Sequence, residues 1–170
     1  MLAQLAEISY NTAMVKIRKI RKSDAGAIVK ILRTFVRFAH TLGDVKINPL
    51  TEKSYLELAF GPKRAFDGLI VLDDKNKAIG YMLYSFGLEC NLYRRYITLE
   101  DLFVVKSERG HGLGRRLMQK LSNIAHAEDC VQIRISVWDK NPEAMKFYKK
   151  LGFKNYSSIE EKYVVRELVG

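Results

Sequence analysis

The sequence predicts an α/β fold in which a mixed β-sheet is flanked by helices. Apolar residues recur in turn with strand spacing and with helix spacing along the 170 residues. A run of alternate glycines lies between one predicted strand and the helix after it. The predicted order is β-α-α-β-β-β-α-β-α-β-β, and its central β-α-β-α part is typical of a sheet with helices packed on it.

The N-terminal third of the chain predicts one strand and two helices. Apolar and basic residues alternate over residues 14–20, as in a half-buried strand. Ser23 and Asp24 are typical of a helix start. The residues that follow at helical spacing are Ile28, Ile31, Leu32, Phe35 and Phe38. Glycine, asparagine and proline within residues 43–49 predict a loop, and residues 51–60 a second, short helix.

The middle of the chain predicts a hairpin, a long strand and a helix. Residues 69–72 are apolar, residues 73–77 are polar turn formers, and residues 78–87 form the return strand. A further strand covers residues 96–105. The alternate glycines come next, and the helix after them has one apolar stripe, formed by Leu113, Leu117, Leu121 and Ile124.

The C-terminal part predicts a strand over residues 131–138 and then a helix. Asn141 is a good N-cap, Pro142 suits the first helical position, and Glu143 faces the positive end of the helix dipole. Gly152 is typical of the residue just past a helix end. The last predicted elements are two strands, over residues 153–156 and 162–168.

Length and composition predict one domain over residues 14–170, with residues 1–13 as an N-terminal extension or leader. Hydrophobic residues make up 48% and charged residues 28% of the chain, which is typical of a globular protein. No apolar run approaches the roughly 18 residues of a membrane span, so no membrane partner is expected. Cys90 and Cys130 are not closely spaced, and two thiols in a chain that can build its own core indicate a reducing, cytoplasmic compartment.

The formal net charge of +10 suggests a polyanionic partner. Nucleic acid and a phosphorylated cofactor are both candidates. The sequence has no zinc-finger spacing and no RNP-type aromatic motif, so a nucleic-acid partner is not expected. Its histidines and cysteines show no metal-ligand spacing, so no metal is expected either.

The clearest functional motif is the segment Arg109-Gly110-His111-Gly112-Leu113-Gly114. Glycines allow successive backbone N–H groups to turn toward one centre, and the helix start adds unpaired donors and a partial positive charge, which suits a pyrophosphate. A P-loop is excluded because Gly114 is followed by two arginines rather than by Lys-Ser/Thr. A Rossmann loop is excluded because Arg115 stands where its third glycine belongs. A glycine-capped turn without a ligand is the alternative.

This segment resembles the Arg/Gln-x-x-Gly-x-Gly/Ala motif of the GNAT acetyltransferases, and the predicted order of elements is similar to theirs. Residues 98–105, Thr-Leu-Glu-Asp-Leu-Phe-Val-Val, are similar to the Leu-Glu-Asp strand of the diamine acetyltransferases, the spermidine/spermine and thialysine group. Asn141-Pro142-Glu143 and Phe147-Tyr148-Lys149 resemble a second motif of that group. The resemblance runs without a gap from Leu99 to Glu160. It implies the GNAT fold with a mostly antiparallel twisted sheet, an acetyl-CoA-dependent N-acetyltransferase, and a homodimer.

The resemblance also implies which residues contact acetyl-CoA. The strand backbone that would pair with the pantetheine arm belongs to Leu102, Phe103 and Val104. The pyrophosphate contacts would come from Gly110, His111, Gly112, Leu113, Gly114 and Arg115, and Arg109 is also expected to bind the cofactor. Further contacts are expected from Asn141, Pro142, Glu143 and Ala144.

Two catalytic residues are expected, Tyr148 and Glu100. The resemblance places the family's general acid at Tyr148, whose phenol would protonate the leaving thiolate of CoA; a core tyrosine is the alternative. Glu100 could carry the proton of the attacking amine away. Glu100 and Asp101 alternate along a strand and are expected to point to opposite faces. With Glu160, they match acidic positions of the diamine acetyltransferases.

The predicted acceptor is a small primary amine with a further positive charge: a diamine, a polyamine or a lysine-like amino acid. The family has an acidic residue at Ala39, a tyrosine at Phe38 and a histidine at Arg134. We therefore expect a shorter amine to be preferred over spermine, and Arg134 could pair with the carboxylate of an amino-acid acceptor. The alternatives are a protein or peptide N-acetyltransferase, and a non-catalytic module that binds acyl-CoA or nucleic acid.

Overall fold

The computed structural model describes residues 15–41, 43 and 50–154. The chain divides into two compact units that meet between Ser136 and Val137, and each unit is described by itself. The predicted N-terminal extension, most of the predicted loop at residues 43–49 and the end of the chain from residue 155 lie outside the described residues. The prediction of one domain over residues 14–170 stays a prediction.

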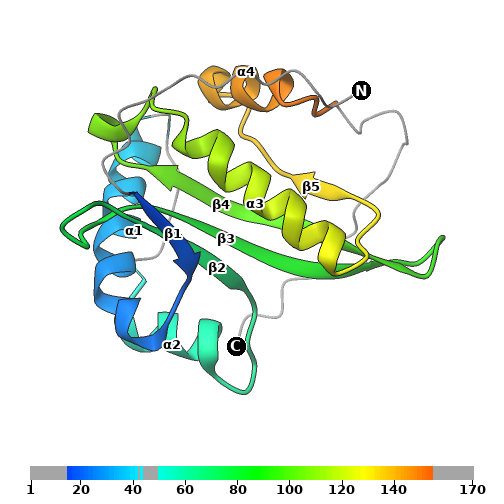
Figure 1. The fold of residues 1–170 in the computed structure, drawn as a ribbon, viewed down its shortest axis with the longest axis horizontal. Coiled ribbons are helices and arrows are strands. Elements are labelled where there is room, and N and C mark those ends of the chain that lie inside the picture. Colours follow the sequence, from blue (N-terminus) through cyan, green and yellow to red (C-terminus); the bar gives the residue numbers. More distant parts are fainter. Residues whose placement is uncertain (1–14, 42, 44–49, 155–170) are drawn as a thin grey trace. The chain divides into compact units, whose positions relative to one another are not determined.

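The first unit is built on a five-stranded sheet whose strands follow the order β1-β2-β3-β4-β5 (Figure 1). The first four strands pair antiparallel, and β5 pairs parallel to β4, so the sheet is mixed and mostly antiparallel, as expected. The strands are β1 (Lys16–Lys19), β2 (Asp67–Leu72), β3 (Ala78–Glu89), β4 (Arg94–Val104) and β5 (Ile133–Ile135).

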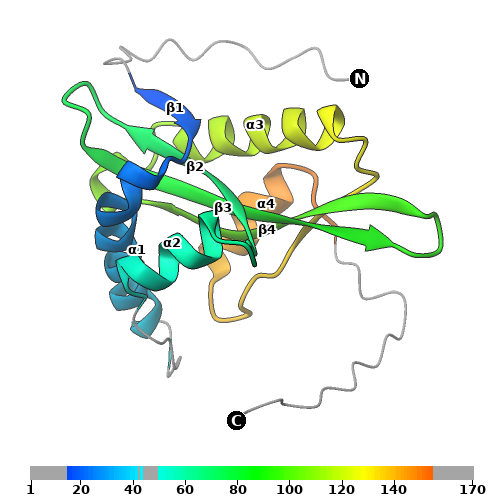
Figure 2. The ribbon, with the colours of Figure 1, turned by 90° about the horizontal axis from the view of Figure 1, so that it is seen from below.

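Helices cover both faces of this sheet. Figures 1 and 2 show α1 (Ala25–His40) and α2 (Glu52–Phe60) on one face and α3 (Leu113–Ala127) on the other. The apolar stripes predicted from helical spacing are confirmed, because the buried residues of α1 and α3 include Ile28, Ile31, Leu117 and Leu121. Short 3-10 turns at Lys22–Asp24 and Lys106–Glu108 precede α1 and the glycine segment. No helix in the described part of the chain is long and apolar enough to cross a membrane.

The starts of α1 and α2 differ in how their side chains cap the helix. Thr51 caps α2, because its hydroxyl oxygen accepts a hydrogen bond from the amide of Ser54 at 3.1 Å. Asp24 makes no side-chain cap for α1. Its carboxylate instead accepts two hydrogen bonds from the Arg18 guanidinium, at 2.6 and 2.8 Å, and one from the Arg21 amide at 2.7 Å. The bonds from Arg18 lower the pKa of Asp24.

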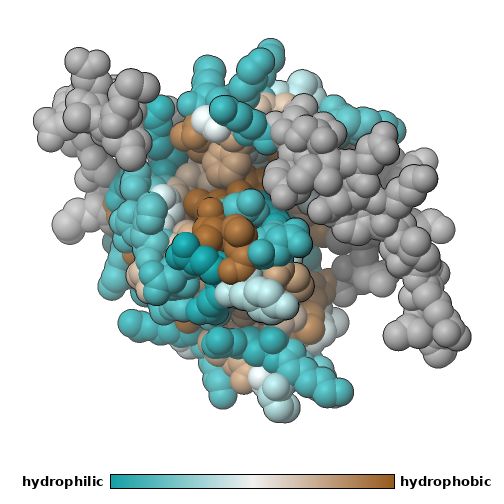
Figure 3. Space-filling view, turned by 90° about the vertical axis from the view of Figure 1, so that its right-hand side faces the viewer, coloured by the Kyte–Doolittle hydropathy of each residue, from teal (hydrophilic) through white to brown (hydrophobic). Residues whose placement is uncertain are grey.

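The long hairpin of β3 and β4 determines the geometry around the candidate site. Its end carries three exposed apolar side chains, Leu88, Leu92 and Tyr93. The side of the molecule toward which the hairpin extends shows apolar residues at its centre, bordered by hydrophilic ones (Figure 3). Within the hairpin, Leu83 pairs with Asp101 and Tyr84 pairs with Leu99, so Glu100 is an extra residue in a β-bulge of β4.

The strand predicted over residues 131–138 is much shorter in the structure. Only Ile133–Ile135 pair with β4, opposite Ile97 to Leu99. Cys130 is still bonded to the end of α3, through its amide and the carbonyl oxygen of Ala125, and after Ile135 the chain leaves the sheet. Among the described residues, the edge of β4 from residue 101 to residue 104 is therefore paired on the β3 side alone.

The second unit contains α4 (Pro142–Lys150). Asn141 caps this helix as predicted, because its side-chain oxygen accepts a hydrogen bond from the Ala144 amide at 3.1 Å. Gly152 follows the helix with a φ of +87°, the conformation expected for a glycine past a helix end. The Tyr148 ring packs against Phe147 and Phe153, with centroids at 5.0 and 5.9 Å.

Candidate active site

The glycine segment forms an open loop at the start of α3. Gly110 and Gly112 have φ angles of +83° and +75°, which only glycine adopts without strain. A Cβ atom added at either position would meet nothing within 4 Å, so the space above both glycines is open to a ligand. The first amides of α3 have no acceptor within the helix. The predicted cradle for a phosphorylated group therefore fits the observed backbone.

Charge around this loop is cationic. The side chains of Arg115 and Arg116 are exposed, and α3 contains no acidic residue in its first turn. His111 lies 4.0 Å from the carboxylate of Glu108, an ion pair only when the imidazole is protonated. A diphosphate at the loop would thus meet backbone donors, the helix dipole and guanidinium groups together.

The side chain of Arg109 contacts the end of β4 and two aromatic rings. Its Nε donates a hydrogen bond to the carbonyl oxygen of Val104 at 2.9 Å. Its guanidinium carbon lies 4.8 Å from the ring centre of Phe38 and 5.3 Å from that of Phe103. The Arg109 side chain therefore ties the loop to the end of β4.

The backbone of β4 offers two amides at its unpaired edge. The Val105 amide donates to Ile79 on β3 at 3.0 Å, so the Phe103 amide also faces β3. The amides of Leu102 and Val104 alternate with it and face away from β3. Of the three residues expected to bind the pantetheine arm, Leu102 and Val104 have outward backbone groups. Phe103 contributes its ring, which packs between α1 and Tyr81.

Both acidic residues of β4 lie on one face, contrary to the expectation from strand alternation. The Tyr81 hydroxyl donates to the Asp101 carboxylate, and the Ser85 hydroxyl donates to Glu100. Tyr81 and Ser85 are four residues apart on β3 and share the face that α1 covers. The bulge explains the difference, because an extra residue interrupts the alternation of side chains.

The two carboxylates differ in their surroundings. Glu100 is exposed to solvent, whereas Asp101 is partly buried. Burial raises the pKa of Asp101 to about 6, although the hydrogen bonds from Tyr81 and from the Leu102 amide lower it. The site therefore holds one exposed acidic side chain and one whose pKa is raised to about 6 by burial.

Two residues of α1 that were expected to contact the amine substrate pack against other parts of the protein. Ala39 is 0% exposed, so its methyl group lies in the core. Phe38 is partly buried, and its ring lies 6.2 Å from that of Phe103 and under the Arg109 guanidinium. Phe38 therefore packs against the end of β4, whereas the burial of Ala39 leaves no surface for contact with the amine substrate.

Arg134 is already bound within the sheet. Its guanidinium donates to Glu89 and, at 3.0 Å, to Gln132, and it lies 3.7 Å from the ring centre of Tyr96. The ring of Tyr96 lies directly over Gly87, where a Cβ atom would come within 2.3 Å of it. Arg134 was expected to pair with the carboxylate of an amino-acid substrate. In the structure, the carboxylate of Glu89 occupies this role.

The remaining predicted residues belong to the second unit or lie outside the description. Asn141, Pro142, Glu143 and Ala144 form the first turn of α4, and Tyr148 lies on its partly buried side. Glu160 lies outside the described residues. Within the described residues, no group of three or more His, Cys, Asp or Glu side chains could hold a metal ion.

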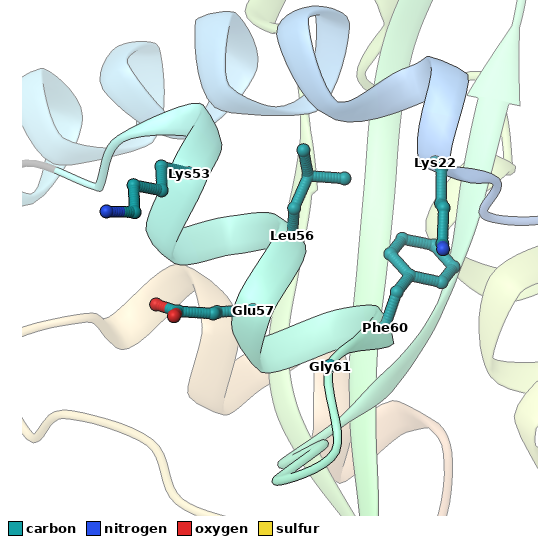
Figure 4. A pocket seen from close by; sticks show the side chains of 6 residues that line it. All are labelled: Lys22, Lys53, Leu56, Glu57, Phe60 and Gly61. Carbon is teal, nitrogen blue, oxygen red and sulfur yellow. The ribbon is translucent and has the colours of Figure 1, made fainter.

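Sequence reasoning missed Tyr81, Ser85 and Glu89, which hold the charged groups of this face. The available signal was a set of polar residues at every fourth position of an otherwise mostly apolar strand. A separate hollow of about 360 Å³ at α2 contains none of the predicted site residues (Figure 4). It is lined by Lys22, Lys53, Leu56, Glu57, Phe60 and Gly61.

Several known proteins are similar to this chain over most of its length. Thialysine N-epsilon-acetyltransferase of Mus musculus is 29% identical over 171 residues, which cover 93% of this chain and 99% of that protein. Spermidine/spermine N(1)-acetyltransferase-like protein 1 of Homo sapiens is 26% identical over 87% of this chain and 22% of its own length. An integron cassette protein from the mobile metagenome of V. cholerae superposes with a TM-score of 0.73 at 25% identity, covering 90% of this chain and 92% of that one.

A family model adds the decisive match. Residues 35–153 match the acetyltransferase (GNAT) family. This range includes the glycine loop, both acidic residues of β4 and the whole of α4. The chain therefore belongs to the acetyltransferase (GNAT) family and is an acetyl-transferring enzyme.

Proposed function

We propose that the protein transfers the acetyl group of acetyl-CoA to a primary amine of a small cationic acceptor. The acceptor class comprises diamines, polyamines and lysine-like amino acids. The observation that carries this proposal is the bulge of β4, which presents Glu100 and Asp101 on one face beside an unpaired strand edge. The similarity to a thialysine acetyltransferase over nearly the full length of both chains supports it.

The donor half of the site is the glycine loop with the edge of β4. The amides of the first turn of α3 would bind the diphosphate of the donor, which supplies a thioester carbonyl. The outward backbone groups of Leu102 and Val104 would orient the pantetheine arm, and the Val104 amide would stabilise the developing oxyanion, because the Leu102 amide donates to the Asp101 carboxylate. Arg109 would hold the glycine loop next to the edge of β4 through its hydrogen bond to the Val104 carbonyl oxygen.

The acceptor half is the anionic face of β3 and β4. Glu100 and Asp101 would attract a cationic amine, and the exposed carboxylate of Glu100 would take a proton from it, directly or through water. The neutral nitrogen then forms a bond to the carbonyl carbon, the carbon–sulfur bond breaks, and the nitrogen releases its second proton to solvent as the amide forms. Tyr148 would donate its phenolic proton to the departing thiolate. Both substrates are bound together, so no acetylated cysteine is required.

Arg134 limits how far a polycation can extend along this face. It shares the face with Glu100, because it pairs with Thr98 on β4. Glu89 neutralises part of its charge, so repulsion of a second ammonium group is expected to be moderate. We propose that short amines are preferred over spermine, and that a homodimer and a cytoplasmic location accompany this function.

The test compares kcat/KM for spermine, a short diamine, thialysine and an N-terminal peptide. We expect thialysine or the short diamine to be the best acceptor. Glu100→Gln should lower kcat/KM by roughly 10²-fold or more, whereas Glu57→Gln on the exposed surface of α2 is the matched control. In Arg134→His, the turnover of spermine should rise relative to that of the diamine. The proposal is wrong if spermine is the best acceptor of the wild type, or if only the peptide is acetylated.

A further inference from the structure

Tyr81 is a buried tyrosine whose hydroxyl group makes a hydrogen bond to a charged residue. Its side chain is 0% exposed and lies in a cluster with Ile31, Leu83 and Phe103. Its ring centre lies 6.3 Å from that of Phe103. A buried phenol needs a hydrogen-bond partner, and the cluster around it is apolar. The partner is the carboxylate of Asp101, to which the hydroxyl donates.

The bond to Tyr81 occupies one side of the Asp101 carboxylate. A carboxylate accepts hydrogen bonds through two oxygens, and Tyr81 contacts Oδ2. Because Asp101 is partly exposed, its remaining acceptor capacity is accessible to a ligand. The bond also lowers the pKa of Asp101, which opposes the effect of burial and favours the ionised form.

We propose that Tyr81 is a positioning residue that fixes the carboxylate of Asp101 to receive the ammonium group of the acceptor. The proposal rests on the proposed function and assigns different roles to the two acidic residues: Asp101 binds the ammonium group and Glu100 removes the proton. The Tyr81 ring is enclosed, so its hydroxyl is a fixed donor. The hydrogen bond between Ser85 and Glu100 lies at a more exposed position. The Glu100 carboxylate can therefore move to take up a proton.

The surroundings of Asp101 leave Tyr81 as its main polar neighbour. On β4 the next side chain is Glu100, which is bonded to Ser85. From α1 the side chains packed on this cluster are apolar, namely Ile31, Leu32, Phe35 and Phe38. The guanidinium of Arg109 lies over the rings of Phe38 and Phe103, and its Nε donates a hydrogen bond to the Val104 carbonyl oxygen. The described groups that act on the Asp101 carboxyl are therefore the Tyr81 hydroxyl and the Leu102 amide.

The experiment is a double-mutant cycle on Tyr81→Phe and Asp101→Asn. It is run on the full chain with the best acceptor of the wild type, whatever that acceptor proves to be. Failure of the proposed function thus appears in the acceptor panel, and failure of the present inference appears in the cycle. Tyr84→Phe is the matched control, because Tyr84 is buried on the same strand but faces the opposite side of the sheet.

We expect Tyr81→Phe to raise the acceptor KM by roughly tenfold to a hundredfold, the loss typical of a hydrogen bond to a charged group. The affinity for acetyl-CoA, measured by calorimetry, should be unchanged. The acidic limb of the kcat/KM profile should move to higher pH, because removal of this donor raises the pKa of Asp101 further. In the Asp101→Asn background, Tyr81→Phe should have no additional effect on the acceptor KM.

Two results would overturn the inference. One is a Tyr81→Phe enzyme with wild-type acceptor KM and an unshifted pH profile. The other is an equal loss in the presence and absence of Asp101, since Tyr81 would then act through packing and not through this carboxylate. Tyr84→Phe should reproduce neither the KM change nor the pH shift, and a similar effect in this control would also count against the inference.

Discussion

Asp101→Asn is expected to make the protein more stable while it weakens the site. Burial of the Asp101 carboxylate raises its pKa from 3.8 to about 6, so the folded protein holds this proton more tightly than the unfolded chain. The stability that the group contributes is present below pH 4 and is lost as the pH rises through about 6. Asparagine has nearly the same shape and no charge, and its carbonyl oxygen can still accept the hydrogen bond of Tyr81.

The size of this effect follows from the displacement of the pKa. A displacement of roughly two pH units corresponds to about 3 kcal/mol at 1.36 kcal/mol per unit. Water that reaches the partly exposed carboxylate screens part of this penalty, so we expect a gain of about 1–2 kcal/mol at pH 7.5. The gain should be much smaller near pH 4, where the carboxyl group of the wild type is protonated in the folded protein and about half protonated in the unfolded chain.

Urea denaturation of wild type and Asp101→Asn at pH 4 and pH 7.5 measures this difference. The matched control is Asp24→Asn, which should give the opposite sign. Because Arg18 lowers the pKa of Asp24, removal of this carboxylate should cost stability at pH 7.5 and less in acid. An Asp101→Asn protein that is less stable than wild type at pH 7.5, or whose gain is the same at pH 4, would refute the reasoning.

Two further predictions concern the donor side. Gly112→Ala and Gly152→Ala both place a Cβ at a positive φ with open space around it, so each should cost about 1 kcal/mol of stability. Calorimetry should show weaker acetyl-CoA binding in Gly112→Ala alone, and equal binding by both variants would count against the loop as the diphosphate site. Tyr148→Phe should lower kcat by roughly 10²-fold or more with little change in acetyl-CoA affinity. Normal turnover with reduced thermal stability would instead identify Tyr148 as a packing residue.

The parts of the fold that depend on short-range pattern could be predicted from the sequence. The stripes of α1 and α3, the helix that begins after Thr51 and the Asn141 cap each involve residues within a few positions of one another. The glycine loop is also local, since the two positive φ angles lie at the glycines themselves. These features need only backbone geometry and helix-end chemistry, which neighbouring residues determine.

The features that were missed depend on pairing between distant segments. The bulge at Glu100 exists only in register with β3, and alternation along β4 alone predicts the wrong face. Arg134 and Glu89 are 45 positions apart, and their contact requires the order of β3, β4 and β5. The short length of β5 could not be predicted either, because it depends on how far this segment pairs with β4.

The bulge also separates the exposed acidic residue of β4 from the residues that form the regular strand. Ile97 and Leu99 face one side of the sheet, and Asp101 and Phe103 face the other, although all four have odd numbers. The two sets fit one regular strand only if Glu100 is left out of the count. A chain without Glu100 would keep every other β4 side chain on its present face, with an unbroken ladder. The strand therefore carries its exposed carboxylate as an insertion, and this acidic position can change or disappear without a change in the core of the sheet.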